Sequence, residues 1–303
     1  MSQLWDAERV VSPQLAQGLI EDQFPRLAPA AVEPLGAGWD NTAYLVNRGW
    51  VFRFPRRRIA VDLIVREARV LPAIAPLLPL AVPVPTFVGQ PDERFGWPFA
   101  GYPMLPGRTA SAATLTEAER LLATEPLARF LATLHAIPAE GLNLPTDEIG
   151  RMDLARHESL DRARLDEVGQ AGLVADVRPL HRLLDGVSEA RPPRAGTLTH
   201  GDVYADHVLV DGDARLTGVI DWGDLHSGDP AVDLSAAHSL LPPSAHRVFL
   251  EAYGPVDEPT WHLARLRALH HSVAVTIYAH HTGRADLLRE GLLALARLAA
   301  GRS

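Results

Sequence analysis

The sequence predicts an α+β protein of two lobes, with a small antiparallel-sheet lobe followed by a larger and mostly helical lobe. Three observations support this class. The chain has 303 residues, and at about 150 residues per domain this length allows two lobes. Short β-type runs dominate before residue 105, whereas helical patterns dominate after residue 107. Apolar residues make up 47% and charged residues 22% of the chain, as in ordinary globular proteins.

The first lobe is expected to hold several short strands and one helix. Apolar runs of period two indicate strands, and apolar residues spaced by three and four indicate a helix. The expected strands are residues 43–46, 50–54, 84–88 and 99–104, and the expected helix is residues 60–74. We place this lobe at residues 1–105, with a hinge at about 102–107.

The second lobe, residues 108–303, is expected to be helical with one β insert. The predicted helices are residues 116–136, 175–189, 230–240, 259–280 and 285–299. Within the β insert, the segments 208–210 and 215–220 flank Asp211-Gly212-Asp213, which is a turn signal. We therefore predict a β-hairpin there.

Composition excludes several kinds of chemistry. The chain has no cysteine, so disulfides, thiol nucleophiles and thiolate metal sites are excluded. All 29 basic residues are arginine, so the chain has no lysine. Lysine nucleophiles are therefore excluded as well. The net charge of −8 argues against a nucleic-acid partner and mildly favours a cationic one.

Targeting signals are not expected. Residues 1–9 contain two acidic side chains and no basic region that leads into an apolar core, so we predict no signal peptide. The uncharged stretch 71–90 contains five prolines, at positions 72, 76, 79, 83 and 85, which argue against a membrane-spanning helix. These observations predict a cytoplasmic protein without a membrane segment.

Three polar residues are expected to gather at one end of the predicted hairpin. Asp202 and His207 lie at or before its first strand, and Asp221 follows its second strand. Because the strands are antiparallel, His207 and Asp221 should be near neighbours, although symmetric pairing about the turn places Gly218 opposite His207. Such a group of side chains can bind a divalent cation and accept the proton of a hydroxyl group. The alternative is that both aspartates only cap loops.

An ion pair is predicted in the first lobe. Trp50, Phe52 and Phe54 alternate along the predicted strand and share one face of it. Arg53 therefore points to the other face of this strand. Glu67 lies in the middle of the apolar stripe of the predicted helix, and a buried carboxylate needs a cationic partner. We favour Arg53 as that partner. The alternatives are a solvated Arg53 and a pair between Glu67 and one of the arginines at 56–58.

Other polar residues receive structural interpretations. His262, His270, His271, His280 and His281 share one long helical pattern, but no two have the spacing of three or four residues that chelation from one helix face needs. We interpret them as core or surface residues. Asp233 is expected to anchor the loop around Asp202 through backbone hydrogen bonds.

The second-lobe motifs together resemble a known family. His200-Gly201-Asp202, a polar residue five positions later, a short hairpin, Ile220-Asp221-Trp222 and the segment 228–234 are similar to the aminoglycoside phosphotransferase family. The resemblance implies a fold like that of the protein kinases, with Mg²⁺ and ATP or GTP bound between the lobes. It also implies transfer of the terminal phosphoryl group to a hydroxyl of a small molecule, an aminoglycoside or macrolide-type antibiotic.

The resemblance assigns roles to these residues. Asp202 would be the catalytic base, and His207 and Asp221 would hold Mg²⁺. The family usually has asparagine at the position of His207. Histidine there is similar to the macrolide-phosphorylating branch, as are Tyr204 and the segment 208–209.

Nucleotide contacts are also implied in the first lobe. Arg53 occupies the position of the lysine that holds nucleotide phosphates in kinase-like enzymes, and Glu67 that of its carboxylate partner. Gly36 and Gly38 match a glycine loop over the phosphates, for which an ordinary tight turn is the alternative. At the hinge, the carbonyl of Pro103 and the N–H of Leu105 would meet the adenine edge.

Two other functions remain open from sequence alone. One is a metabolic kinase of the same fold, acting on choline, a sugar amine or homoserine. The other is a non-catalytic nucleotide-binding protein, which the missing lysine and the replaced asparagine favour. The sequence leaves open the acceptor, the choice of ATP or GTP, and whether the protein is a monomer or a homodimer.

Overall fold

The computed structural model describes residues 7–38 and 40–301. They form two compact units. Unit 1 contains the residues up to Leu77, Ala81–Leu105 and Trp222–Leu225, and unit 2 contains Leu78–Leu80, Pro106–Asp221 and the residues from His226 onward. Most of the segment in which we expected no signal peptide lies outside the described residues. Within the described ranges, no helix combines the length and the apolar character needed to cross a bilayer.

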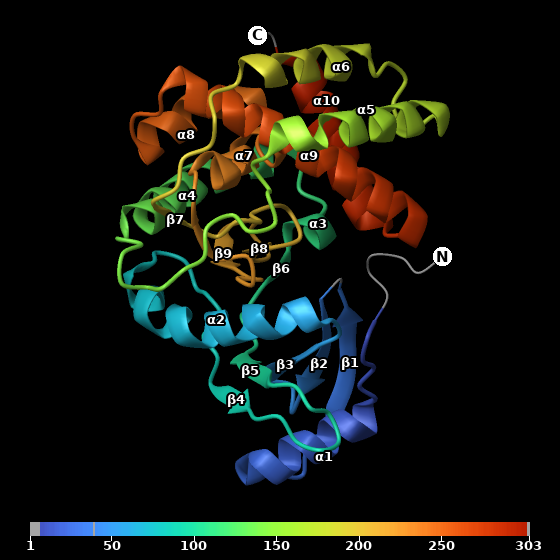
Figure 1. The fold of residues 1–303 in the computed structure, drawn as a ribbon, viewed down its shortest axis with the longest axis vertical. Helices are drawn as coiled ribbons and strands as arrows, with labels where there is room; N and C mark the ends of the chain where they lie inside the picture. The colour runs from blue at the N-terminus through green and yellow to red at the C-terminus, as the bar shows by residue number, and fades with distance from the viewer. Residues whose placement is uncertain (1–6, 39, 302–303) are drawn as a thin grey trace. The chain divides into compact units, whose positions relative to one another are not determined.

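Unit 1 contains a five-stranded antiparallel sheet with strand order β1-β2-β3-β5-β4 (Figure 1). The strands are β1 (Val32–Ala37), β2 (Asn41–Val46), β3 (Trp50–Pro55), β4 (Phe87–Gly89) and β5 (Phe99–Pro103). The strand predicted at 84–88 is shifted to 87–89. The prolines at 83 and 85 explain this shift, because proline has no N–H to donate to a neighbouring strand.

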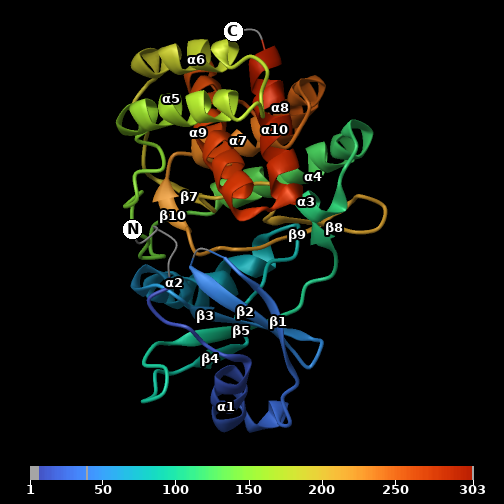
Figure 2. The same ribbon diagram turned by 90° about the vertical axis from the view of Figure 1, so that its right-hand side faces the viewer.

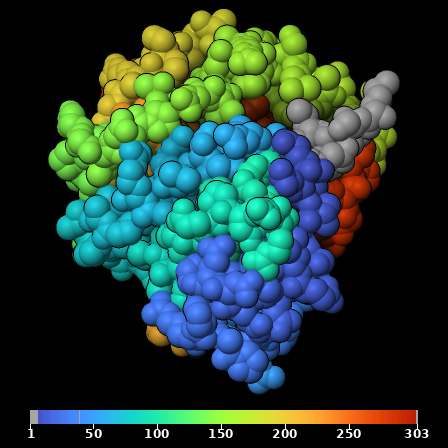
Figure 3. All heavy atoms as spheres, turned by 60° about the horizontal axis from the view of Figure 1, so that its bottom comes forward, coloured from blue at the N-terminus to red at the C-terminus, as the bar shows by residue number. Residues whose placement is uncertain are grey.

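The two faces of this sheet are covered by different helices. Phe52 and Phe54 of β3 share a buried core with residues of α1 (Pro13–Gln23), whereas Ile64 of α2 (Arg58–Ile74) packs with residues of β5 on the other face. In Figure 3, the dark blue amino-terminal residues adjoin the teal segment around residues 85–100. Hydrogen bonds between Gln23 and Gln90 join these two segments.

Unit 2 is mainly helical, as the sequence predicts (Figure 2). Its helices are α3 (Ala110–Ala113), α4 (Glu117–Ala136), α5 (Leu154–Gln170), α6 (Arg178–Asp185), α7 (Ala231–Ser239), α8 (His246–Tyr253), α9 (Glu258–Thr282) and α10 (Ala285–Ala300). The predicted α+β class is therefore confirmed. Helices α1, α3, α5 and α8 were not predicted from the sequence. In α5 only Leu154, Asp161, Leu165 and Val168 are buried, which leaves too weak an apolar stripe to recognise.

Two small β-ribbons carry the loops of interest in unit 2. One pairs β7 (Thr197–Thr199) with β10 (His226–Gly228), and the other contains β6 (Arg108–Thr109), β8 (Val208–Val210) and β9 (Leu216–Val219). Strands β8 and β9 form the predicted hairpin. The loop from β7 to β8 contains Asp202 and His207, and Asp221 follows β9.

Candidate active site

The loop between β7 and β8 is fixed by buried Asp233 of α7. The Asp233 carboxylate accepts hydrogen bonds from the backbone N–H groups of His200 and Gly201, each at 2.8 Å. Gly201 has a φ of +88°, which glycine adopts without steric cost because it lacks a Cβ. Nε2 of His200 also forms a hydrogen bond with the carbonyl oxygen of Ile220, at 3.0 Å. These contacts confirm the predicted anchoring role of Asp233 and fix the backbone that presents Asp202.

Asp202 lies among three basic side chains. Its Oδ1 is 3.2 Å from Nε2 of His271 and 3.5 Å from Nη1 of Arg151. Its Oδ2 is 3.5 Å from Nδ1 of His207. Burial raises the pKa of a carboxyl group, but the three basic neighbours outweigh burial and hold the pKa of Asp202 well below its usual value. Asp202 is therefore a carboxylate that can accept a hydrogen bond from a hydroxyl group.

The register of the hairpin brings His207 and Asp221 closer together than the sequence indicated. Gly218 pairs with Leu209, so the expected pairing of Gly218 with His207 is wrong. A longer turn and a bulge between Leu209 and Val210 shift the second strand along the first. The N–H of Ile220 instead donates to the carbonyl oxygen of His207 at 2.9 Å. Asp221 is thus the residue directly after the one that pairs with His207.

Both ring nitrogens of His207 approach oxygen atoms. Nδ1 lies 2.8 Å from the backbone carbonyl oxygen of Asp202, and Nε2 lies 3.4 Å from Oδ2 of Asp221. Burial lowers the pKa of His207, but the carboxylates of Asp221 and Asp202 outweigh burial and raise it above its usual value. Asp221 has a φ of +63°, a conformation that is uncommon for residues with a side chain and recurs at functional sites.

The fit of His207 and Asp221 to a metal ion can be tested on this geometry. Within the described residues, no group of three or more histidine, cysteine, aspartate or glutamate side chains could hold a metal ion. When Nδ1–H of His207 donates to the Asp202 carbonyl, Nε2 directs its lone pair toward the Asp221 carboxylate. Mg²⁺ is commonly held by one or two protein side chains, with water and phosphate oxygens as its other ligands. In its neutral form, His207 together with Asp221 can therefore hold a metal ion that binds together with a nucleotide.

Unit 1 contains the predicted ion pair. Nη1 of Arg53 lies 2.9 Å from Oε1 of Glu67, whose side chain is fully buried. The hydroxyl of Tyr102 donates to Oε2 of Glu67 at 2.7 Å. A Cβ atom built on Gly223 would lie 3.5 Å from Oε1, so the segment after Asp221 also packs against this carboxylate. The pairing of Arg53 with Glu67 is confirmed, and it fixes the guanidinium group on the α2 face of the sheet.

The other residues predicted to contact a nucleotide lie at the ends of strands in unit 1. Gly36 is in β1, and Gly38 begins the turn into β2; Trp39 of this turn lies outside the described residues. Both glycines are exposed, and a Cβ atom at either position would meet no atom within 4 Å, so packing does not require glycine there. Pro103 is the last residue of β5, and Leu105 ends this part of unit 1.

Two residues that contact Asp202 were missed in the sequence analysis. His271 belongs to α9 and was interpreted only as a core or surface residue, because the search for metal ligands considered spacing within that helix. Arg151 precedes α5, a helix that was not predicted. One signal was available: Arg267 and His271 are four residues apart on the same helix, and Arg267 is only 3% exposed.

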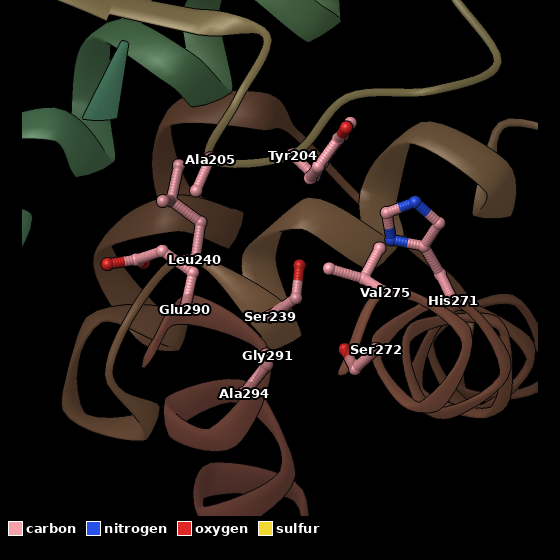
Figure 4. Close-up of a pocket in the computed structure, with 10 residues that line it drawn as sticks. All are labelled: Tyr204, Ala205, Ser239, Leu240, His271, Ser272, Val275, Glu290, Gly291 and Ala294. Atoms are coloured by element: carbon pink, nitrogen blue, oxygen red, sulfur yellow. The ribbon is translucent and has the colours of Figure 1, made fainter. Parts of the chain in front are cut away.

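His271 and Tyr204 also border a small pocket in unit 2 (Figure 4). Their rings pack edge to face, with centroids 4.8 Å apart. The pocket has a volume of about 20 Å³, which is room for about one water molecule and is too small for an acceptor of sugar size. Its lining consists of Tyr204, Ala205, Ser239, Leu240, His271, Ser272, Val275, Glu290, Gly291 and Ala294.

A sheet unit with a buried Arg–Glu pair and a helical unit with an Asp-His-Asp group define a kinase-like phosphotransferase. The model of the phosphotransferase enzyme family matches residues 31–269. The chain therefore belongs to this family, and it is a phosphotransferase. The predicted resemblance to the aminoglycoside phosphotransferases is confirmed.

Two relatives match more than half of the chain at 29% and 31% identity. Viomycin phosphotransferase of Streptomyces vinaceus is 29% identical over 257 residues, which cover 79% of this chain and 84% of the relative. Aminoglycoside 3′-phosphotransferase of Streptomyces fradiae is 31% identical over 192 residues, which cover 57% of this chain and 67% of the relative.

Solved structures share the fold. Wild-type aminoglycoside 2′-phosphotransferase-IIIa, in its GDP complex, has a TM-score of 0.68 and 25% identity, and the match covers 96% of this chain and 99% of that structure. Macrolide 2′-phosphotransferase type I has a TM-score of 0.57 and 26% identity, with 97% and 100% covered. The predicted kinase-like fold is confirmed.

Proposed function

We propose that this phosphotransferase uses Mg²⁺ and ATP or GTP to phosphorylate a hydroxyl group of an antibiotic of the aminoglycoside or macrolide type. The arrangement of Asp202, His207 and Asp221 carries the proposal, because it places a carboxylate base beside a pair of side chains suited to a metal ion. The names of the relatives support the acceptor class. The GDP complex of aminoglycoside 2′-phosphotransferase-IIIa supports a nucleotide donor.

Asp202 acts on the acceptor. Its ionised carboxylate accepts a hydrogen bond from the acceptor hydroxyl, orients the oxygen and takes the proton as the new bond to phosphorus forms. His271 and the anchored loop fix the direction of this carboxylate. When bound by His207 and Asp221, Mg²⁺ would neutralise negative charge on the phosphates of the donor.

Residues of unit 1 bind the donor. Arg53, oriented by Glu67, holds phosphate oxygens with its planar guanidinium group. Backbone N–H groups of the turn with Gly36 and Gly38 add contacts to phosphate, and Pro103 and Leu105 offer a carbonyl and an N–H to the nucleotide base. The reaction takes place in the cytoplasm, where nucleoside triphosphates are supplied.

An acceptor screen tests this function. The purified protein is incubated with Mg²⁺, ATP or GTP, and kanamycin, viomycin, a macrolide, choline or homoserine, and phosphorylated product is detected by mass spectrometry. We expect one antibiotic acceptor to gain a single phosphoryl group, and Asp202→Asn to slow its formation by about 100-fold or more. Phosphorylation of choline or homoserine alone would instead identify a metabolic kinase, and nucleotide binding without any transfer would identify a non-catalytic protein.

A further inference from the structure

We propose that Arg151 is a further catalytic residue, whose guanidinium group binds the phosphoryl group while it passes from the donor to the acceptor hydroxyl. The inference rests on the proposed function, because it takes Asp202 as the base that receives the hydroxyl proton. It adds a permanent cation to unit 2, where the sequence motifs contain only Asp202, His207 and Asp221.

Arg151 is presented by a well-defined turn. The carboxylate of Asp147 accepts the backbone N–H groups of Arg151 at 2.8 Å and of Met152 at 2.7 Å. The N–H of Gly150 donates to the carbonyl oxygen of Asp147 at 3.1 Å, and Gly150 has a φ of +68° that favours glycine. Met152 is buried and Asp153 caps α5. These contacts hold the backbone of Arg151 independently of Asp202.

The contact of Arg151 with the base differs from the ion pairs of Arg120 and Arg191 in unit 2. Arg120 lies 2.7 Å from Glu290, and Arg191 lies 2.6 Å from Asp229, both at hydrogen-bond distance. Nη1 of Arg151 is 3.5 Å from Asp202, which is an electrostatic contact beyond the usual hydrogen-bond length. The Arg151 side chain is also 21% exposed. The turn thus places a guanidinium group beside the base and within reach of solvent.

The geometry of transfer brings the phosphoryl group to this point. An acceptor oxygen lies about 2.6–3.2 Å from its base, and reacting atoms approach to about 3–3.5 Å before the bond forms. The bond from phosphorus to the bridging oxygen breaks as the bond to the acceptor oxygen forms. The proton passes to Asp202, and the nucleoside diphosphate leaves with the bridging oxygen. A guanidinium 3.5 Å from the same carboxylate is then close to the phosphoryl oxygens.

Negative charge gathers at this point during transfer. Asp202 and Asp221 both carry negative charge, and the transferred group spreads further negative charge over three oxygens. His271 is neutral, because burial keeps the pKa of its imidazole below the usual value. Arginine keeps its charge at any physiological pH and offers two parallel N–H groups to phosphate oxygens. Since the chain has no lysine, such a role falls to an arginine.

The test uses water as the acceptor, so that no antibiotic is needed. Wild type, Arg151→Gln and Arg156→Gln are compared in Mg²⁺-dependent ATP hydrolysis, and in the binding of Mg²⁺–ADP with and without aluminium fluoride, which mimics the phosphoryl group in transfer. Arg156 is an exposed arginine near the start of α5, the helix that follows Arg151, and serves as the matched control.

We expect Arg151→Gln to lower hydrolysis by about 100-fold or more and to weaken the aluminium fluoride complex by a similar factor. Affinity for Mg²⁺–ADP should remain within about threefold, because ADP lacks the transferred group. Arg156→Gln should match the wild type in every measurement. For the variant Arg151→Ala, added guanidinium ion should restore part of the lost rate, which a misfolded protein does not allow.

Other results would overturn the inference. Wild-type hydrolysis and a wild-type aluminium fluoride complex in Arg151→Gln would remove Arg151 from the reaction. An equal loss of affinity for ADP with and without aluminium fluoride would show a general role in nucleotide binding. A wild-type protein that does not bind Mg²⁺–ADP, or binds it no more tightly with aluminium fluoride, would contradict the proposed function itself.

Discussion

Nε2 of His271 lies 3.2 Å from Oδ1 of Asp202, so a histidine of helix α9 borders the carboxylate that the hairpin loop presents. Burial lowers the pKa of His271 despite the nearby carboxylate, so its imidazole is neutral, and Nε2 makes a polar contact with Oδ1 of Asp202 that does not meet hydrogen-bond geometry. This contact links the carboxy-terminal helices directly to the candidate base.

The contact predicts a positioning role for His271. His271→Leu should lower kcat by about tenfold with little change in KM for either substrate, because the base loses the polar contact that orients it. His271→Gln, whose Nε2 can replace the imidazole nitrogen, should recover most of the rate. The exposed His281 on the same helix provides the control, His281→Gln. Equal losses in the Leu and Gln variants would show that His271 acts only through packing.

Substitution of Asp202 separates chemistry from binding. Asp202→Asn should lower turnover by about 100- to 10,000-fold, since an amide cannot accept the hydroxyl proton. Nucleotide affinity should stay within about threefold, because the proposed donor contacts involve other residues. Steady-state kinetics and calorimetric titration with Mg²⁺–ADP measure the two quantities. Unchanged turnover would rule out Asp202 as the base.

A double-mutant cycle can test the ion pair between Arg53 and Glu67 in unit 1. Arg53→Ala and Glu67→Ala should each weaken nucleotide binding by about tenfold, and the double variant should lose clearly less than the product of the two factors. The reason is that each single substitution already removes the same interaction. Losses that multiply independently would mean that Glu67 does not act through Arg53.

Asp221 is expected to make nucleotide binding depend on Mg²⁺. In the wild type, added Mg²⁺ should raise ADP affinity, whereas Asp221→Ala should bind ADP equally weakly with and without Mg²⁺. Asp211→Ala, in the turn at the opposite end of the same hairpin, is the control. A normal magnesium effect in Asp221→Ala would place the metal elsewhere.

Stability should fall on acidification because of buried histidines of unit 2. Burial lowers the pKa of His270 to about 4, although it donates a hydrogen bond to Asp161 at 2.7 Å. The unfolded chain, with a histidine pKa near 6.5, therefore binds more protons between about pH 6.5 and pH 4. The stabilisation is present above pH 6.5 and is lost as the pH falls toward 4.

This linkage is measurable by urea unfolding at pH 7 and pH 5. His270→Asn, which keeps an N–H donor and cannot titrate, should reduce the loss of unfolding free energy between these pH values by roughly 1–2 kcal/mol. The exposed His280 on the same helix gives the control, His280→Asn. An identical loss in wild type and His270→Asn would show that His270 is not among the groups responsible.

Much of the fold could be predicted from local patterns. The alternation around Arg53 and the stripe around Glu67 each assign one side chain to a face, and the sheet then brings the two faces together. For this reason the Arg53–Glu67 pair was predictable. Strand β4 was misplaced because prolines shorten it. Helix α5 was missed because few apolar residues mark it.

The sequence by itself determined the motif residues and their order along the chain. Asp202, His207 and Asp221 lie on or next to one hairpin, so antiparallel pairing alone makes them neighbours. Only the exact pairing of residues across the two strands was predicted wrongly. Arg151 and His271 come from a turn and a helix that are distant in sequence, and no local rule relates them to Asp202. Only tertiary packing, which places both beside one carboxylate, brought them to the site, because side-chain proximity between remote segments depends on how whole elements pack.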